Sequence, residues 1–200
     1  MKVLAPILIF AFWLIMIFTA SHNLRVFTTF SKALYEAGPI PRKIPEFFLT
    51  DQNGKNRKIS EFRGKYILVN FMYTRCKSVC HIVNSKLIHV KDRIIDLMPE
   101  KIQIVSISFD QAEEPDRLDM SWRHHGSAPG WWWTELSEQD SKSNAEKLRA
   151  MGIWVGQRPN GEYDHTAFIF LVNPMGDVIK IFRPEMDSDL LADAVLEEIK

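Results

Sequence analysis

The two cysteines are the residues whose type and spacing most directly indicate chemistry. Cys76 and Cys80 are the only cysteines among 200 residues, and Arg75 and Lys77 flank the first of them. At the start of a helix, a spacing of four residues places both sulfurs on one side, with the Cα atoms about 6 Å apart along the axis. The positive end of the helix dipole and the neighbouring cations favour the thiolate. The pair could therefore chelate one soft metal ion, exchange disulfides or form a disulfide.

One alternative is a disulfide that only stabilises the fold, since exported domains commonly oxidise their thiols. Closing a four-residue loop removes less entropy from the unfolded chain than the ~3 kcal/mol expected for a 15-residue loop. Chemistry at the two sulfurs therefore explains the pair better than stability does.

The residues around the cysteines predict the elements that hold them. Residues 66–73 form a nearly continuous apolar run, which is typical of a strand buried on both faces. After the cysteine loop, apolar residues recur every three or four positions and predict a long helix that ends before Pro99. Residues 101–110 predict a second buried strand. The unit is therefore βαβ, with a sheet that is at least partly parallel.

The rest of the chain completes an α/β pattern. It predicts a hairpin over residues 46–60, helices over 114–124 and 141–151, strands over 166–172 and 177–182, and a C-terminal helix over 187–200. The cluster Trp131-Trp132-Trp133 is expected to pack in the core or in a strand. A βαβ unit followed by a hairpin and a helix predicts a thioredoxin-like α/β sandwich with a mixed sheet.

The N-terminal part differs in composition from the rest. Residues 3–20 are uncharged and apolar over eighteen positions, which predicts one uncleaved transmembrane anchor. The prolines within residues 38–45 favour an extended tether. We therefore expect an anchor over residues 1–22, a linker over 23–43 and a globular domain over 44–200. The 25 basic residues are balanced by 25 acidic ones, which argues against nucleic-acid binding.

Three segments together resemble the Sco/SenC family of copper-binding thioredoxin-fold proteins. Residues 69–80, with the sequence VNFMYTRCKSVC, are similar to the strand and C-x-x-x-C loop of that family. Residues 163–177 are similar to its Asp-His strand and hairpin, and residues 106–110 to its second strand, which ends in Asp. The resemblance covers residues 44–200, which makes it much more specific than an isolated C-x-x-x-C.

The resemblance implies a metal site and a function. The family's copper-binding histidine falls on His165, so that Cys76, Cys80 and His165 would bind one Cu(I) or Cu(II) ion per chain, a set of donors that suits copper. Family members deliver copper to, or prepare thiols for, the dinuclear copper site of a cytochrome oxidase subunit. The resemblance thus implies a metallochaperone rather than an enzyme, with that subunit, other copper chaperones or thiol reductases as partners. The domain would lie on the non-cytoplasmic side of a membrane, most simply in a bacterial periplasm.

A thiol-disulfide oxidoreductase acting on an exported partner is the main alternative, with Cys76 as nucleophile and Cys80 as resolving thiol. The loop also departs from the family pattern. Lys77 and Ser78 stand where the family has Pro-Asp, and His81 stands in place of a following proline. We expect His81 to be exposed rather than ligating, and the pair His124-His125 to be solvated. Asp164 is a candidate to orient the imidazole of His165.

Overall fold

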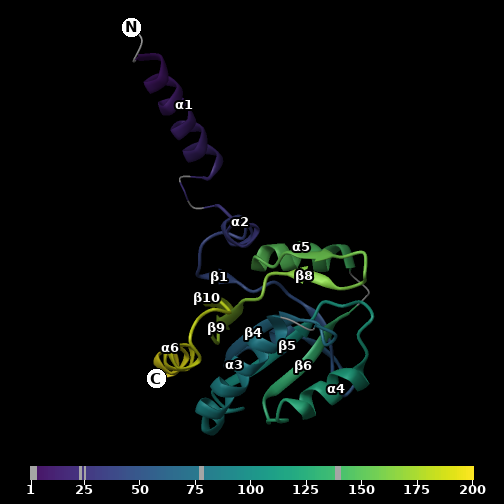
Figure 1. The fold of residues 1–200 in the computed structure, drawn as a ribbon. Helices are drawn as coiled ribbons and strands as arrows, with labels where there is room; N and C mark the ends of the chain where they lie inside the picture. The colour runs from purple at the N-terminus through teal and green to yellow at the C-terminus, as the bar shows by residue number, and fades with distance from the viewer. Residues whose placement is uncertain (1–3, 23, 25, 77–78, 138–140) are drawn as a thin grey trace.

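The fold is built on one mixed sheet. The computed structural model describes residues 4–22, 24, 26–76, 79–137 and 141–200. Within them, eight strands form a sheet in the order β1-β10-β9-β4-β5-β6-β2-β3, shown in Figure 1. The pairs β4/β5 and β5/β6 are parallel, and the remaining pairs are antiparallel. The predicted α/β sandwich with a mixed sheet is confirmed.

The strands at the centre of the sheet are the most apolar. The bounds of the strands are β1 Arg42–Lys43, β2 Phe48–Asp51, β3 Asn56–Lys58, β4 Tyr66–Met72, β5 Ile102–Ser108, β6 Trp131–Leu136, β9 Ile169–Val172 and β10 Asp177–Phe182. All seven residues of β5 are buried, as expected for a strand in the middle of the sheet. Two buried polar side chains on neighbouring strands pair with each other, since Ser106 Oγ donates to Asn70 Oδ1 at 2.7 Å.

Two layers cover the sheet. Helices α3 Val79–Ile94, α4 Pro115–His124 and α6 Ser188–Ile199 lie below it in Figure 1. Helix α5 Ser141–Met151 and the hairpin of β7 Val155–Gln157 and β8 Tyr163–His165 lie above it. Short 3-10 turns occupy Ile59–Phe62 and Ile95–Leu97. The cysteine loop joins β4 in the middle of the sheet to α3 in the lower layer.

Two helices precede the sheet. Helix α1 spans Leu4–Ala20 and α2 spans Thr29–Glu36. Helix α2 lies inside the segment that we expected to be an extended linker. It is stabilised by a capping box between Thr28 and Ser31, and its Leu34 packs against Gly152 after α5.

The membrane-spanning character expected of the N-terminal segment is not seen. Among the residues that the structure describes, no helix is both long and apolar enough to cross a membrane. The transmembrane anchor over residues 1–22 stays a prediction.

The tryptophan cluster forms a strand that the pattern of the sequence did not delimit. Trp131, Trp132 and Trp133 begin β6 and pair in parallel with β5. Trp131 and Trp133 are each 1% exposed, so they fill the core, as expected for aromatic residues in a strand. The indole N–H of Trp132 donates to Gln103 Oε1 at 2.8 Å.

Candidate metal centre

The register of the sheet brings the cysteine loop and His165 to the same edge. Strands β4 and β9 are antiparallel, and Asn70 pairs with Ile169. The end of β4 therefore lies beside the start of β9. Cys76 follows the first strand by a few residues, and His165 precedes the second by a few. Residues 85 positions apart in sequence, Cys80 and His165, are thus placed in contact.

Cys76, Cys80 and His165 form one compact group of donor atoms. Their sulfur and ring-nitrogen atoms all lie within 4.8 Å of one another. Cys80 Sγ lies 3.5 Å from His165 Nε2. Cys76 and Cys80 are each 4% exposed and His165 is 7% exposed, so the group is shielded from bulk water. The structure places together the three residues that the sequence singled out.

The surroundings of the His165 imidazole favour the tautomer that leaves Nε2 available to a metal. Its Nδ1 lies 3.0 Å from the carbonyl oxygen of Thr166. Because a carbonyl only accepts, Nδ1 carries the proton and donates it, and the lone pair on Nε2 faces Cys80. Histidines that bind metals commonly have this arrangement, with the second nitrogen held by a carbonyl or carboxylate.

Aromatic side chains hold the ring from the sides. The ring centroids of Phe109 and Tyr73 lie 5.0 Å and 5.8 Å from that of His165, both in edge-to-face geometry. Tyr163 packs edge to face on both of them. This cluster restricts rotation of the imidazole and lowers the local polarity around the sulfurs.

The two cysteines are thiols rather than a disulfide. A hydrogen bond to Cys76 and, next, burial raise the pKa of the Cys80 thiol far above its usual range. Cys80 therefore keeps its proton at neutral pH until a metal or an oxidant displaces it. Burial is also the main reason that the pKa of Tyr73 is raised, so this phenol is neutral beside the thiols.

Carboxylates anchor the loop on its N-terminal side. Glu113 accepts hydrogen bonds from the Thr74 amide at 3.0 Å and from its hydroxyl at 2.7 Å. Asp110 accepts from Arg75 Nε at 3.1 Å. Both carboxylates belong to the turn after β5, so the backbone just before Cys76 is tied to the neighbouring strand.

The donors present fit a soft metal ion. Bonds of about 2.0–2.3 Å from a metal to nitrogen and sulfur, as for zinc, place donors within about 4 Å of one another. A contraction of less than about 1 Å would bring the three atoms to that spacing. Two sulfurs and one imidazole nitrogen are the donor types that copper accepts in both of its common oxidation states.

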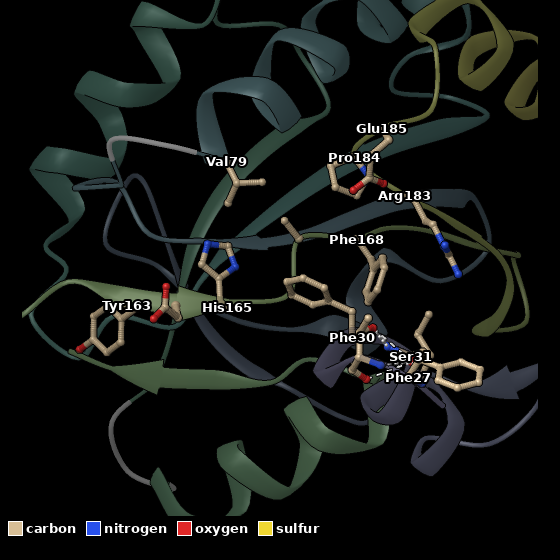
Figure 2. Close-up of a pocket in the computed structure, with 14 residues that line it drawn as sticks. Phe27, Phe30, Ser31, Val79, Tyr163, His165, Phe168, Arg183, Pro184 and Glu185 are labelled. Atoms are coloured by element: carbon tan, nitrogen blue, oxygen red, sulfur yellow. Dashed lines mark hydrogen bonds between the residues drawn. The ribbon is translucent and has the colours of Figure 1, made fainter. Parts of the chain in front are cut away.

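A cavity opens beside the group. It has a volume of about 670 Å³ and is lined by His165 and Val79 from the metal-site side, Phe27 and Phe30 from the segment around α2, and Arg183. Figure 2 shows the His165 imidazole pointing toward Val79 at one side of this cavity, with Phe30 and Phe168 facing it across the space. The cavity gives access to the histidine side of the group.

The other candidate residues take different places. Asp164 pairs with Arg158, whose Nε donates to it at 2.8 Å, and the imidazole uses the Thr166 carbonyl instead. Asp164 therefore does not orient His165. His81 is exposed, as expected. His125 is half-buried rather than solvated, and its ring stacks on Trp133. Lys77 and Ser78, which differ from the Pro-Asp of the family pattern, lie outside the described residues.

Comparison with known proteins agrees with the family resemblance found in the sequence. Residues 39–200 match the family model described as SCO1/SenC. Protein sco1 of Schizosaccharomyces pombe is 25% identical over 156 residues, which cover 74% of this chain and 58% of that protein. This chain thus spans little more than half the length of that relative.

Solved structures show the same fold. Arabidopsis thaliana ScoI, crystallised with copper bound, superposes with a TM-score of 0.69 at 23% identity, covering 79% of this chain and 98% of that one. The thioredoxin domain of a thiol-disulfide oxidoreductase from Bacteroides vulgatus superposes with a TM-score of 0.59 at 20% identity, covering 80% and 97%. The thioredoxin-like fold predicted from the sequence is confirmed.

Proposed function

Because this chain belongs to the SCO1/SenC family, we propose that it binds one copper ion through Cys76, Cys80 and His165. We propose further that it delivers the copper to, or prepares thiols for, the dinuclear copper site of a cytochrome oxidase. One observation carries the proposal: two thiols and an imidazole lone pair converge within 4.8 Å in a buried pocket. The Arabidopsis relative, which has the same fold, was solved with copper bound.

Each residue has a distinct role in this proposal. The two sulfurs, once deprotonated, hold Cu(I), because thiolates are soft donors. His165 supplies a nitrogen that is compatible with Cu(II) as well, and the contact of its Nδ1 with the Thr166 carbonyl leaves Nε2 facing Cys80. Three protein donors leave a coordination position for a ligand from the receiving protein. The ion can therefore be passed on by ligand exchange.

A thiol-disulfide oxidoreductase is the second candidate, favoured by the hydrogen bond between two reduced, adjacent thiols. In this function, Cys76 attacks a partner's disulfide and Cys80 then attacks the mixed disulfide. The partner is reduced as Cys76 and Cys80 are joined. The low exposure of both sulfurs, 4% each, and the histidine that faces them favour metal binding.

The location of the domain is part of the proposal. We place the globular domain, residues 44–200, on the non-cytoplasmic side of a membrane, most simply in a bacterial periplasm. Residues 1–22 would act as the anchor and 23–43 as the linker. Helix α1, Leu4–Ala20, contains no charged residue, and its side chains from Ile7 to Phe18 are largely exposed, which supports attachment to lipid. Extraction of membranes with carbonate would release the chain if this assignment is wrong.

The direct test is a titration of the reduced full-length chain with Cu(I) in the presence of a competing chelator. We expect one tight site that is lost in Cys76→Ser, Cys80→Ser and His165→Ala. His89→Ala is the matched control, because His89 lies on the same helix as Cys80 but contacts Asp189. If His165→Ala binds copper as tightly as the unmodified chain, the three-donor site is wrong. Weak copper binding together with rapid disulfide exchange would instead favour the oxidoreductase.

A further inference from the structure

Two adjacent histidines end α4 beside the start of α3, which carries a third histidine. His124 is the last residue of α4 and His125 is its C-cap. Asn84, in the second turn of α3, lies with its Nδ2 3.4 Å from His125 Nε2. His81 is three residues before Asn84 on α3, and residues three apart share one side of a helix. His81 is therefore directed to the same region as His125, away from the group around Cys80.

His125 is held as a neutral donor. Its Nδ1 donates a hydrogen bond to the Ser121 carbonyl oxygen at 2.7 Å, so Nε2 keeps its lone pair. The ring is stacked on Trp133 with centroids 4.9 Å apart. Burial lowers the pKa of His125, and the proximity of His124 and His81 lowers it further. Histidines that bind metals commonly have one nitrogen held by a carbonyl in this way, and an ion at Nε2 would replace the contact with Asn84 Nδ2.

The surrounding groups can complete a coordination shell. The His124 ring lies 5.1 Å from the His125 ring, and the side chains of His124 and His81 are exposed, so both can rotate toward an ion near His125. The Oδ1 atom of Asn84 is buried and has no hydrogen-bond partner among the described residues. Rotation of that amide would turn an oxygen donor toward the same place.

We propose that His81, His124 and His125 form a second metal site, which takes a divalent ion of the class that prefers imidazole, Cu(II) above all. Copper(II) has the highest affinity of the divalent first-row metals for nitrogen donors. The site is specific to this chain, since the Sco/SenC pattern has proline at the position of His81. It does not depend on the function proposed for Cys76, Cys80 and His165.

The two sites are neighbours in the sequence. His81 follows Cys80 directly in the sequence. An ion on the exposed imidazoles would therefore be held at the surface of the helix that carries Cys80, on the side that faces away from the thiols.

The test uses the full chain with the first site disabled by Cys76→Ser, Cys80→Ser and His165→Ala. We expect this protein to bind one Cu(II) ion and to show nitrogen couplings in its electron paramagnetic resonance spectrum. Adding His81→Ala and His124→Ala should weaken Cu(II) binding at least tenfold and reduce those couplings. His89→Ala, on the same helix, should change neither. Circular dichroism verifies that each variant is folded.

The same histidine variants should be compared in the otherwise unmodified chain, in case the triple variant does not fold. There the expected result is a fall in bound copper from two ions to one, with the tight site retained. Equal Cu(II) affinity with and without His81 and His124 would overturn the proposal. An equal loss in His89→Ala would overturn it too, because binding would then be non-specific.

Discussion

Glu113 offers the sharpest test of how the loop before Cys76 is held. Its carboxylate is 7% exposed and accepts three hydrogen bonds, from the amide and the hydroxyl of Thr74 and from Ser108 Oγ at 2.9 Å. Glu113→Ala removes both acceptor oxygens and with them all three hydrogen bonds. The Thr74 amide and the Ser108 hydroxyl then lose their partners in a largely buried region.

The expected cost follows from the number and burial of these bonds. Hydrogen bonds to a charged group contribute about 1.5–3 kcal/mol each, but release of the buried carboxylate and entry of water offset part of this. We therefore expect Glu113→Ala to lower the free energy of unfolding by about 2–4 kcal/mol. Glu113→Gln is the matched control. Its amide oxygen can accept from Thr74 N and Ser108 Oγ, and its NH₂ group can donate to the Thr74 hydroxyl, so the loss should stay below about 1.5 kcal/mol.

Urea unfolding measures the stability change, and Cu(I) competition measures the effect on the site. Because Thr74 is two residues before Cys76, we expect Glu113→Ala to weaken copper binding by about 10–100-fold, the range seen when groups that orient metal ligands are removed. The m-value should stay constant. An unchanged unfolding midpoint in Glu113→Ala would refute the reasoning. So would an alanine variant no more destabilised than the glutamine variant.

Three further outcomes are expected. Because the pKa of the Cys80 thiol is raised, copper must displace its proton on binding. The apparent Cu(I) affinity should therefore rise at least about tenfold per pH unit between about pH 6 and 8. A chelator titration that shows no pH dependence would contradict this. Gly152→Ala should cost about 2–4 kcal/mol in thermal unfolding, because φ is +81° and the new Cβ would lie 2.9 Å from Leu34 Cδ2. Gly64→Ala, with φ +88° and open space, should cost only about 1–2 kcal/mol, and equal losses would exclude the clash. Tyr73→Phe should cost about 1 kcal/mol in urea unfolding, because it removes the acceptor for the Tyr163 amide at 3.3 Å; an unchanged midpoint would show that this bond is not needed.

The parts of the fold that the sequence predicts are those with local periodicity. Strand β4, strand β5 and helix α3 follow from apolar runs of the expected length, and α5 appears at Ser141–Met151, the range predicted. The hairpin β7–β8 was missed, because its strands are three residues long and carry no alternating apolar pattern. Helix α2 was missed because its stability depends on a capping box and on packing against a distant glycine.

The residues of the metal site also differ in whether local sequence patterns can identify them. The cysteine pair can be recognised locally, since strand, loop and helix follow one another in the sequence. His165 cannot, because its position depends on the pairing of β4 with β9 across a long separation. Only the family resemblance indicated it. Asp164, chosen for its adjacency to His165, is a wrong choice because its carboxylate pairs with the nearby cation Arg158 instead.

Hydrogen bonds from outside the cysteine motif hold the backbone just before Cys76. Thr74 and Arg75 are held by Glu113 and Asp110, both of which lie after β5. A turn bond from the Cys76 amide to Tyr73 O, at 3.2 Å, continues this support to the first sulfur. The backbone before Cys76 is therefore held by side chains outside the cysteine motif, and a comparison limited to that motif would miss these contacts.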